Sequence, residues 1–298
     1  MQLSLDLART IAVVVDEGTF DAAARRLNIT PSAVSQRVRA MEQQVGRSLL
    51  VRSKPVRATA AGDTIVRLAR QLDMLDHEVG AELGLDGDRV PSLSIAANAD
   101  SLGTWLLPAL ARVAREHDVV FDLHRDDQER TAELLESGVA MAAVTSRAEA
   151  VAGCIARPLG SMRYHAVAAP SVLQRYRHGP GDEWLRDAPL VQFDRYDDLQ
   201  AHFLRSRGID PGVPPRHVVP STHDFARAVA MGLGWGMLPE AQSAELLDRG
   251  EFERLEGDAI DVPLHWQQWN IRSALITAVA DSVADEASAA LRPLVRSR

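Results

Sequence analysis

The sequence predicts an α/β protein with an all-helical N-terminal domain, a long connecting helix and a body of two α/β lobes. Apolar residues keep a helical spacing up to about residue 83, whereas short apolar runs alternate with helical stretches from about residue 92 onward. Charge divides the chain in a similar way. The first 60 residues hold nine basic and five acidic residues, a net +4, while the whole chain carries −8, so the other 238 residues carry −12. A basic head on an acidic body is typical of a protein that binds nucleic acid with one end.

Composition sets the broad class. A chain of 298 residues is long enough for two or three domains, and 46% hydrophobic with 25% charged residues is typical of a globular protein. The single cysteine, Cys154, excludes an internal disulfide framework and fits a reducing compartment. No basic-then-apolar leader opens the chain and no run of 18 apolar residues occurs in it. We therefore expect a cytoplasmic protein with no membrane partner.

The first 50 residues predict three helices. An apolar stripe at helical spacing from Leu5 to Val15 indicates a supporting helix. Thr19 is a cap for a second helix, which ends at Asn28 because Asn tolerates a left-handed backbone. Thr30 caps a third helix, and Gly46 ends it. Two short helices joined by a tight turn are the arrangement of a helix-turn-helix.

The third helix has an apolar face and a polar face. Hydroxyl, amide and guanidinium groups on the polar face suit close approach to base edges and phosphates in a major groove. An ordinary pair of helices with a solvated face is the alternative, but the caps and the basic flanks favour a helix-turn-helix. The apolar face consists of Val34, Val38, Met41 and Val45, and the polar face of Ser32, Ser35, Gln36 and Arg39.

A basic hairpin is expected next. Short strands from Leu49 to Arg52 and from Val56 to Thr59 flank a turn, with Arg52, Lys54 and Arg57 at the tip. Such a hairpin is the wing of a winged helix-turn-helix and contacts phosphates or a minor groove, whereas a merely solvated basic loop is the alternative. The expected DNA-binding residues are Thr30, Pro31, Ser32, Ser35, Gln36, Arg37, Arg39, Arg52, Lys54 and Arg57.

Thr59 caps a long helix whose apolar residues are separated by 3, 4, 3 and 4 positions, the spacing of a coiled coil. A second copy is expected to cover this seam, giving a homodimer, and further a homotetramer, with paired heads for a two-fold symmetric DNA site. A helix packed on its own body is the alternative. Gly84 to Pro91 reads as a hinge, so the expected units are 1–58, 59–84, 85–91 and 92–298. The seam residues are Ile65, Leu68, Leu72, Leu75 and Val79.

Predicted strands and helices alternate along the body in two successive sets. This βαβ pattern predicts parallel sheets in two lobes. Two similar lobes with a cleft between them form a small-molecule clamp of the periplasmic-binding-protein type. The expected strands are Leu93–Ala97, Val119–Leu123 and Met141–Val144 in the first lobe and Leu190–Phe193, His217–Val219 and Trp235–Leu238 in the second. The expected helices are Leu102–Arg115, Glu129–Glu136, Leu199–Arg205 and Asp224–Met231.

Ligands of open α/β sheets bind at the carboxyl ends of strands, where helix N-termini present free N–H groups. Polar residues follow the predicted strands on both sides of the expected cleft. Each of them taken alone reads equally well as a helix cap, and Trp105 and Trp235 are more often core residues than ligand platforms. Their joint placement nevertheless favours a ligand site. The candidates are Asn98, Asp100, Ser101, Asp126, Thr145, Asp194, His223 and Trp235.

The helix-turn-helix segment resembles the DNA-binding domain of the LysR-type transcriptional regulators. Their pattern, G-[ST]-F-x-x-A-A-x-x-L followed by [TS]-x-[SP]-A-V-S-x-x-[IV], is met without a gap by Gly18, Thr19, Phe20, Ala23, Ala24, Leu27, Thr30, Ser32, Ala33, Val34, Ser35 and Val38. The resemblance implies that the chain crosses to the second lobe around Tyr164 to Pro170 and returns around Trp269 to Ala274. The first lobe is then 92–166 and 271–298, the second is 167–270, and a last helix from Ala274 to Leu294 rejoins the first lobe.

Stretches of the body resemble one branch of that family, the LysG and ArgP type, which regulates basic amino-acid export and metabolism. The branch usually has Glu at the position of Asp126 and often Lys near Arg195, so this chain departs from it there. The resemblance implies L-lysine or L-arginine as effector, an exporter gene as target, and RNA polymerase as a further partner. The stretches are Asn98–Leu110, the pair Asp127 and Gln128, Met141–Ser146, the pair Gly153 and Cys154, Pro158–Tyr164, Gly232–Glu240 and Val262–Trp269.

The candidate residues suit such an effector. An amino acid needs donors for its carboxylate, which Ser101 and Thr145 provide together with helix N–H groups. Its ammonium and a cationic side chain need carboxylates. Asp100, Asp126 and Asp194 rank first among the acids, which also include Asp122, Asp127 and Asp224.

Enzyme motifs are missing from the sequence. It contains no G-x-x-x-x-G-K-[ST], no G-x-S-x-G and no paired-cysteine zinc spacing, so we expect no catalytic residue, no metal and no cofactor. The sequence thus predicts an effector-responsive transcription factor. The alternatives are a ligand-independent architectural protein of the nucleoid and a cytoplasmic binding or catalytic module that carries a helix-turn-helix.

Overall fold

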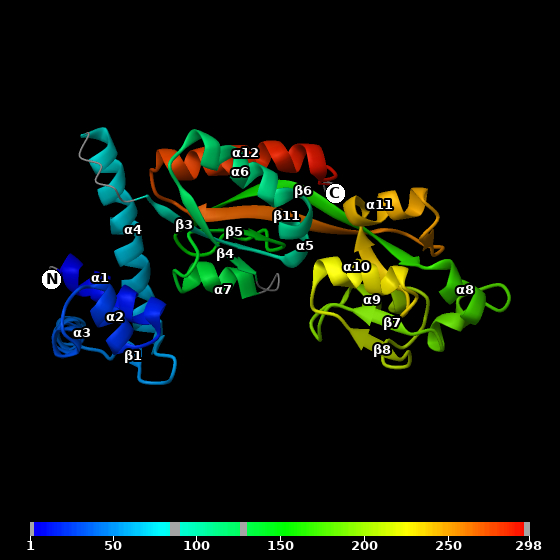
Figure 1. Ribbon diagram of the computed structural model, residues 1–298, viewed down its shortest axis with the longest axis horizontal. Coiled ribbons are helices and arrows are strands. Elements are labelled where there is room, and N and C mark those ends of the chain that lie inside the picture. The colour runs from blue at the N-terminus through cyan, green and yellow to red at the C-terminus, as the bar shows by residue number, and fades with distance from the viewer. Residues whose placement is uncertain (1–2, 84–89, 126–129, 295–298) are drawn as a thin grey trace.

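The computed structural model describes residues 3–83, 90–125 and 130–294. A small helical head lies at one end, a long helix stands beside it, and two α/β lobes follow in line (Figure 1). The head, residues 3–58, and the long helix contain α1 (Leu5–Glu17), α2 (Phe20–Arg26), α3 (Pro31–Val45), β1 (Leu50–Val51), β2 (Arg57–Ala58) and α4 (Ala60–Glu82).

Caps fix the helices of the head where the sequence predicts them. The hydroxyl of Thr19 accepts a hydrogen bond from the Ala22 N–H at 3.2 Å, and that of Thr30 accepts one from the Ala33 N–H at 3.2 Å. Asn28 has a φ of 54° and Gly46 a φ of 73°, so both helix ends use the left-handed backbone. The predicted wing is confirmed, because β1 and β2 pair in antiparallel fashion.

Helix α4 belongs partly to the core of the head. Ile65, Val66 and Ala69 are buried there together with residues of α1 and α3. Ile65 was predicted to lie in a dimer seam; that assignment is wrong, because the helical spacing does not tell which neighbour covers the residue. Leu68 and Leu72 are half-buried, whereas Leu75 and Val79 are 38% and 53% exposed. The uncovered part of the seam therefore lies in the second half of the helix.

Lobe I is a sheet with helices on both faces. Strands β4, β3 and β5 lie side by side in that order and are parallel, as predicted. Helices α6 and α12 cover one face and α7 lies on the other (Figure 1). Its elements are β3 (Ser92–Ala97), α5 (Ala99–Ser101), the π-helix η1 (Leu102–Leu106), α6 (Leu107–Glu116), β4 (Val120–Arg125), α7 (Arg130–Glu136), β5 (Ala142–Thr145) and α12 (Ala274–Ala290).

Lobe II repeats this design with shorter strands. Strands β7 and β8 are parallel, as predicted, whereas β9 is antiparallel to its neighbour β6. Its elements are α8 (Pro170–Tyr176), the 3-10 helix η2 (Glu183–Arg186), β7 (Leu190–Gln192), α9 (Leu199–Arg205), β8 (Arg216–Val218), α10 (Thr222–Ala230), β9 (Gly236–Pro239), α11 (Glu240–Asp248) and β10 (Glu253–Arg254).

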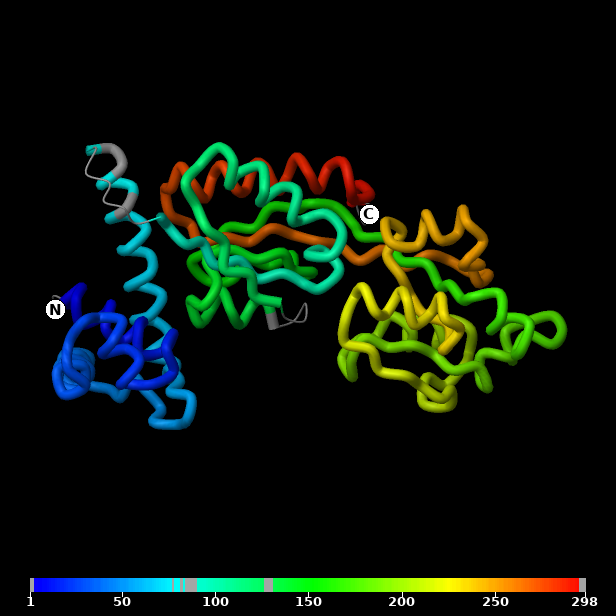
Figure 2. Tube along the Cα trace, in the orientation of Figure 1, coloured from blue at the N-terminus to red at the C-terminus, as the bar shows by residue number. Residues whose placement is uncertain are grey.

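Two long antiparallel strands join the lobes, β6 (Cys154–Ala168) and β11 (Ile260–Trp269). Strand β11 already pairs with β5 of lobe I from His265 onward, and the register of β6 and β11 shifts between Leu264 and His265. The return to lobe I therefore occurs inside β11, so the predicted return around Trp269 to Ala274 is too late along the chain. The tube in Figure 2 shows both strands passing between the lobes, with α12 ending beside them.

Trp235 is the second candidate that the structure corrects. Its side chain is fully buried, and the centroid of its ring lies 5.3 Å from that of Phe203 on α9. An aromatic pair of this kind stabilises a core by area burial and by ring geometry. Trp235 is therefore a core residue of lobe II and not a ligand platform.

A tight turn after α7 brings lobe I against α4. Gly138 lies in this turn with a φ of +74°, and a Cβ built on it would fall 2.8 Å from the Cα of Arg67 on α4. The guanidinium of Arg67 donates to the Glu136 carbonyl at 3.3 Å, and that of Arg70 donates to the Gly138 carbonyl. The head and the body thus meet at this turn.

Gly138→Ala is expected to destabilise the protein more than Gly153→Ala does. Gly153 has a similar φ of +81°, so both alanines carry a left-handed strain of about 1–2 kcal/mol. Nothing lies within 4 Å of a Cβ at Gly153, so only Gly138→Ala adds a clash. Urea unfolding should show an extra loss of at least about 1 kcal/mol for Gly138→Ala. Equal midpoints for the two variants would contradict the close approach of α4.

Candidate functional sites

The polar face of α3 points away from the core of the head. Val34, Val38 and Met41 are buried against the neighbouring helices, which leaves the opposite face to solvent. Among the predicted DNA-binding residues of this segment, Thr30, Pro31, Ser32, Gln36 and Arg39 are exposed, and Ser35 and Arg37 are half-buried. Donors and acceptors at these positions can reach base edges in a major groove.

The wing is held rigidly beside α3. The Val56 N–H donates to the Gly18 carbonyl at 2.8 Å, and the Leu49 N–H donates to the carboxylate of Glu42, on α3, at 2.9 Å. Arg52, Lys54 and Arg57 are all exposed on this hairpin. Exposed cations on a rigid hairpin are placed to bind phosphates, which adds affinity without adding sequence preference.

A half-buried carboxyl joins the lobes. Asp100 lies on α5 of lobe I; one of its oxygens accepts a hydrogen bond from the Tyr164 hydroxyl at 2.7 Å and the other from the Thr222 hydroxyl at 3.4 Å. Tyr164 belongs to β6, and Thr222 opens α10 of lobe II. Burial raises the pKa of Asp100 above its ordinary value, and the two hydrogen bonds lower it without restoring it.

A second half-buried carboxyl lies near the first. Asp197 follows β7 of lobe II and accepts hydrogen bonds from the N–H groups of Phe193 and Leu199 at 3.0 and 3.2 Å. Burial raises the pKa of Asp197 more than these bonds lower it, and the charge of Asp100 raises it further. We call Asp100, Tyr164, Asp197 and Thr222 the interlobe site. Two desolvated carboxyls favour a cationic group between them.

The other candidates of lobe I have different local contacts. Asn98 caps α5, since its side-chain oxygen accepts a hydrogen bond from the Ser101 N–H at 3.0 Å. The Ser101 hydroxyl is buried and has no hydrogen-bond partner within the described ranges. Thr145 ends β5, where it accepts a hydrogen bond from the Arg147 N–H. All three lie at the carboxyl edge of the lobe I sheet, as predicted.

The candidates of lobe II differ in exposure. Asp194 accepts hydrogen bonds from the N–H groups of Tyr196 and Asp197 at 2.7 and 3.0 Å, so its carboxylate shapes the loop that carries Asp197. His223 is exposed in the first turn of α10, next to Thr222. Asp126 lies outside the described residues.

Sequence reasoning missed two residues of the interlobe site, Tyr164 and Asp197. Thr222 had a usable signal, because it stands in a Ser-Thr-His run that opens a helix and follows a predicted strand at the expected cleft. Tyr164 and Asp197 had none, since their proximity to Asp100 comes from the folding of β6 and of the loop after β7.

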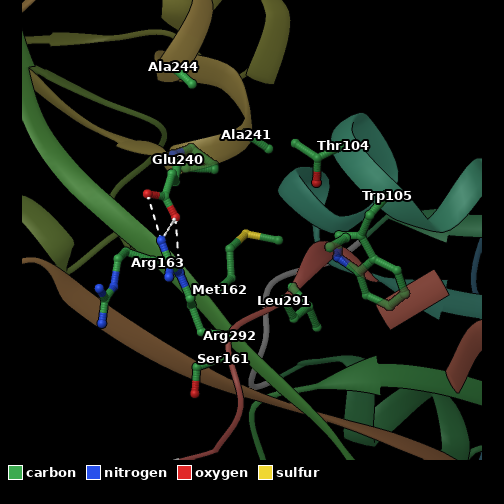
Figure 3. A pocket seen from close by; sticks show the side chains of 12 residues that line it. Thr104, Trp105, Ser161, Met162, Arg163, Glu240, Ala241, Ala244, Leu291 and Arg292 are labelled. Atoms are coloured by element: carbon green, nitrogen blue, oxygen red, sulfur yellow. Dashed lines mark hydrogen bonds and ion pairs between the residues drawn. The ribbon is translucent and has the colours of Figure 1, made fainter. Parts of the chain in front are cut away.

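A pocket of about 240 Å³ lies on another side of the junction between the lobes. Figure 3 shows Thr104, Trp105, Met162 and Leu291 around it, with the Glu240 carboxylate bound to the Arg292 guanidinium at 2.9 Å. The backbone of Arg292 also pairs with Ser161 of β6 in both directions, at 2.7 and 2.9 Å. The segment after α12 therefore ties lobe I to the start of α11 in lobe II.

Two further features bear on the class of protein. No helix in the described part of the chain is long and apolar enough to cross a membrane. Within residues 3–83, 90–125 and 130–294, no group of three or more His, Cys, Asp or Glu side chains is arranged to hold a metal ion.

Comparison with known families gives two matches that together span most of the chain. Residues 5–63 match the bacterial regulatory helix-turn-helix protein of the lysR family. These residues comprise nearly all of the head and the start of α4. Residues 86–287 match the LysR substrate binding domain.

Individual relatives match over nearly their whole length. The lysine export transcriptional regulatory protein LysG of Corynebacterium efficiens is 42% identical over 285 residues, covering 95% of this chain and 97% of the relative. The crystal structure of ArgP from Mycobacterium tuberculosis is 42% identical, with a TM-score of 0.88, covering 98% of this chain and 100% of that one. Full-length LysG from Corynebacterium glutamicum with bound effector Arg is 38% identical, with a TM-score of 0.80, covering 97% and 100%. The present chain therefore belongs to the LysR family of bacterial transcriptional regulators.

Proposed function

We propose that this regulator binds a basic amino acid, L-lysine or L-arginine, at the interlobe site and so controls an amino-acid exporter gene. The observation that carries the proposal is the pair of desolvated carboxyls, Asp100 and Asp197, contributed by different lobes. A cationic ligand relieves the cost of desolvating both charges. The relative named a lysine export regulator and the relative with bound Arg support the same ligand class.

Ligand binding changes regulation through the relative position of the lobes. Asp100 is hydrogen-bonded both to the shared strand β6 and to α10, so a ligand that binds its carboxylate meets both lobes. A ligand shifts such an equilibrium only by its different affinity for the two arrangements. The cationic ligand therefore favours the arrangement in which both carboxyls reach it.

The active form in this proposal is a homodimer, further assembled as a homotetramer, with paired heads on a two-fold symmetric promoter site. The exposed residues Leu75 and Val79 of α4 support it, because a second copy can bury them. The functional units are 1–58, 59–84, 85–91 and 92–298, although the core of the head also draws on α4. The protein acts in the cytoplasm with RNA polymerase as a further partner and has no enzymatic activity.

A ligand screen tests the effector class. L-lysine or L-arginine should raise the melting temperature of the purified protein, because a ligand that binds only the folded state stabilises it. L-glutamate should leave it unchanged, since a second carboxylate would face Asp100 and Asp197. Footprints on the protein's own promoter region, recorded with each amino acid, then link binding to DNA. A shift with L-glutamate but not with either basic amino acid would rule out this effector class.

Asp100→Asn should lower the affinity for the basic amino acid by about tenfold or more, because the amide keeps an oxygen acceptor but loses the charge. The raised pKa of Asp100 also sets the direction in which the affinity for the effector changes with pH. Affinity should fall as the pH falls through that raised value, since protonation removes the charge, and the variant should show a weaker dependence. Calorimetry at several pH values measures both effects. Asp281→Asn is the control, because Asp281 on α12 is exposed and paired with Arg157.

Substitutions in the head should separate base reading from phosphate binding. Ser35→Ala and Gln36→Ala should reduce the preference for the operator over other sequences while changing the salt dependence little. Arg52→Ala should weaken binding to all sequences and lower the salt slope by about one, because one phosphate contact is lost. Arg186→Ala, in lobe II and paired with Glu183, is the control. A change of sequence preference at constant slope in Arg52→Ala would mean that the wing reads bases.

A further inference from the structure

One guanidinium at the junction of the lobes has no part in the contacts described above. Arg125 is the last residue of β4, and its partner in the register with β3 is Ala97, directly before Asn98. Because β3 and β4 are parallel, their carboxyl ends meet at one edge of the sheet. Arg125 therefore stands beside the start of α5, the helix that carries Asp100.

The side chain of Arg125 reaches the second lobe. Its guanidinium lies over the ring of Phe193, 5.8 Å from the ring centroid. Phe193 follows β7, and its N–H donates to Asp197 of the interlobe site at 3.0 Å. The ring contact with Phe193 and the register pairing of Arg125 with Ala97 thus place the Arg125 guanidinium at the edge of that site.

Two other arginines near the edge are already paired with acids, whereas Arg195 donates to the Tyr196 hydroxyl at 2.6 Å. Arg147, which follows β5, lies 3.7 Å from the Glu136 carboxylate, and Arg227 of α10 lies 3.5 Å from that of Asp224. Arg125 has no acidic partner within ion-pair distance among the residues that the structure describes, and it is exposed. The four members of the interlobe site are two carboxyls, a phenol and a hydroxyl, so they provide no cation for a ligand's carboxylate.

We propose that Arg125 binds the α-carboxylate of the effector and thereby selects an amino acid over a ligand of the same shape without that charge. This inference rests on the proposed function. The planar guanidinium offers two parallel N–H groups, which match the two oxygens of a carboxylate. Phe193 supports the guanidinium plane from lobe II, so the effector's carboxylate is bound between the two lobes. The cationic groups of the effector, which bind Asp100 and Asp197, are bound between the lobes as well.

Calorimetric titration of the full chain with L-arginine and L-argininamide tests the proposal, with displacement titrations for weak binding. The amide keeps the ammonium and the side chain of arginine but lacks the carboxylate charge. The wild-type protein should prefer L-arginine by at least about tenfold. Arg125→Gln should bring this ratio close to one, mainly by weakening L-arginine, and Arg125→Lys should lie between them because it keeps the charge without the fork. L-lysine and L-lysinamide provide the same comparison for the other basic side chain.

Arg175→Gln is the matched control. Arg175 also holds its guanidinium over an aromatic ring of lobe II, that of Tyr176 at 5.2 Å, but it lies on α8 at the far end of that lobe (Figure 1). It should leave the ratio as in the wild type. Equal weakening of L-arginine and L-argininamide by Arg125→Gln, or no weakening at all, would overturn the proposal and leave Arg125 as a packing residue between the lobes. Failure of the wild type to bind either basic amino acid would instead refute the proposed function.

Discussion

The antiparallel pair of β6 and β11 is the constraint on which the rest of the structure depends. Strand β6 runs from lobe I into lobe II and β11 runs back, with β5 paired at one end and β9 and β10 at the other. Tyr164, Trp266 and Trp269 are buried along this pair, so it also carries much of the central core. A shift of register between Leu264 and His265 marks the place where a bend disturbs the ladder least. The lobes can therefore change their relative position mainly by flexing this pair.

Two sets of polar contacts, here called ties, link the lobes across the β6–β11 pair, and they differ in strength. The ion pair of Arg292 and Glu240 is partly exposed, with 52% and 34% of the side chains accessible, so it contributes at most about 1 kcal/mol. The hydrogen bonds of Asp100 are part-buried, and a bond to a charged group contributes about 1.5–3 kcal/mol. Reversing a hundredfold preference between two arrangements takes about 5.5 kcal/mol, so neither tie alone locks the lobes. A ligand that engages the carboxyl of Asp100 acts on the stronger tie.

The sequence predicts the head well because its signals are local. Thr19, Thr30 and Gly46 fix helix ends through neighbouring backbone groups. These helix ends can therefore be predicted without knowledge of the remaining fold. Strands β6 and β11 were not predicted as continuous, because their burial pattern changes where they leave one lobe for the other. Ile65 was misassigned because an inward stripe and a dimer seam share one period. The contact of Asp100 with Tyr164, 64 residues apart, follows only from the fold.

The same long-range packing connects the body to the head. Arg70 of α4 donates both to the carboxylate of Asp16 on α1 and to the carbonyl of Gly138 after α7, so one side chain bridges head and lobe I. Four residues further along, Met74 packs into the core of the body, while Ala69 lies in that of the head. Packed interfaces move as units and do not deform continuously. A displacement of the turn at Gly138 therefore moves α4, and with it α3 of the head. A change in the relative position of the lobes can reach the DNA through these contacts.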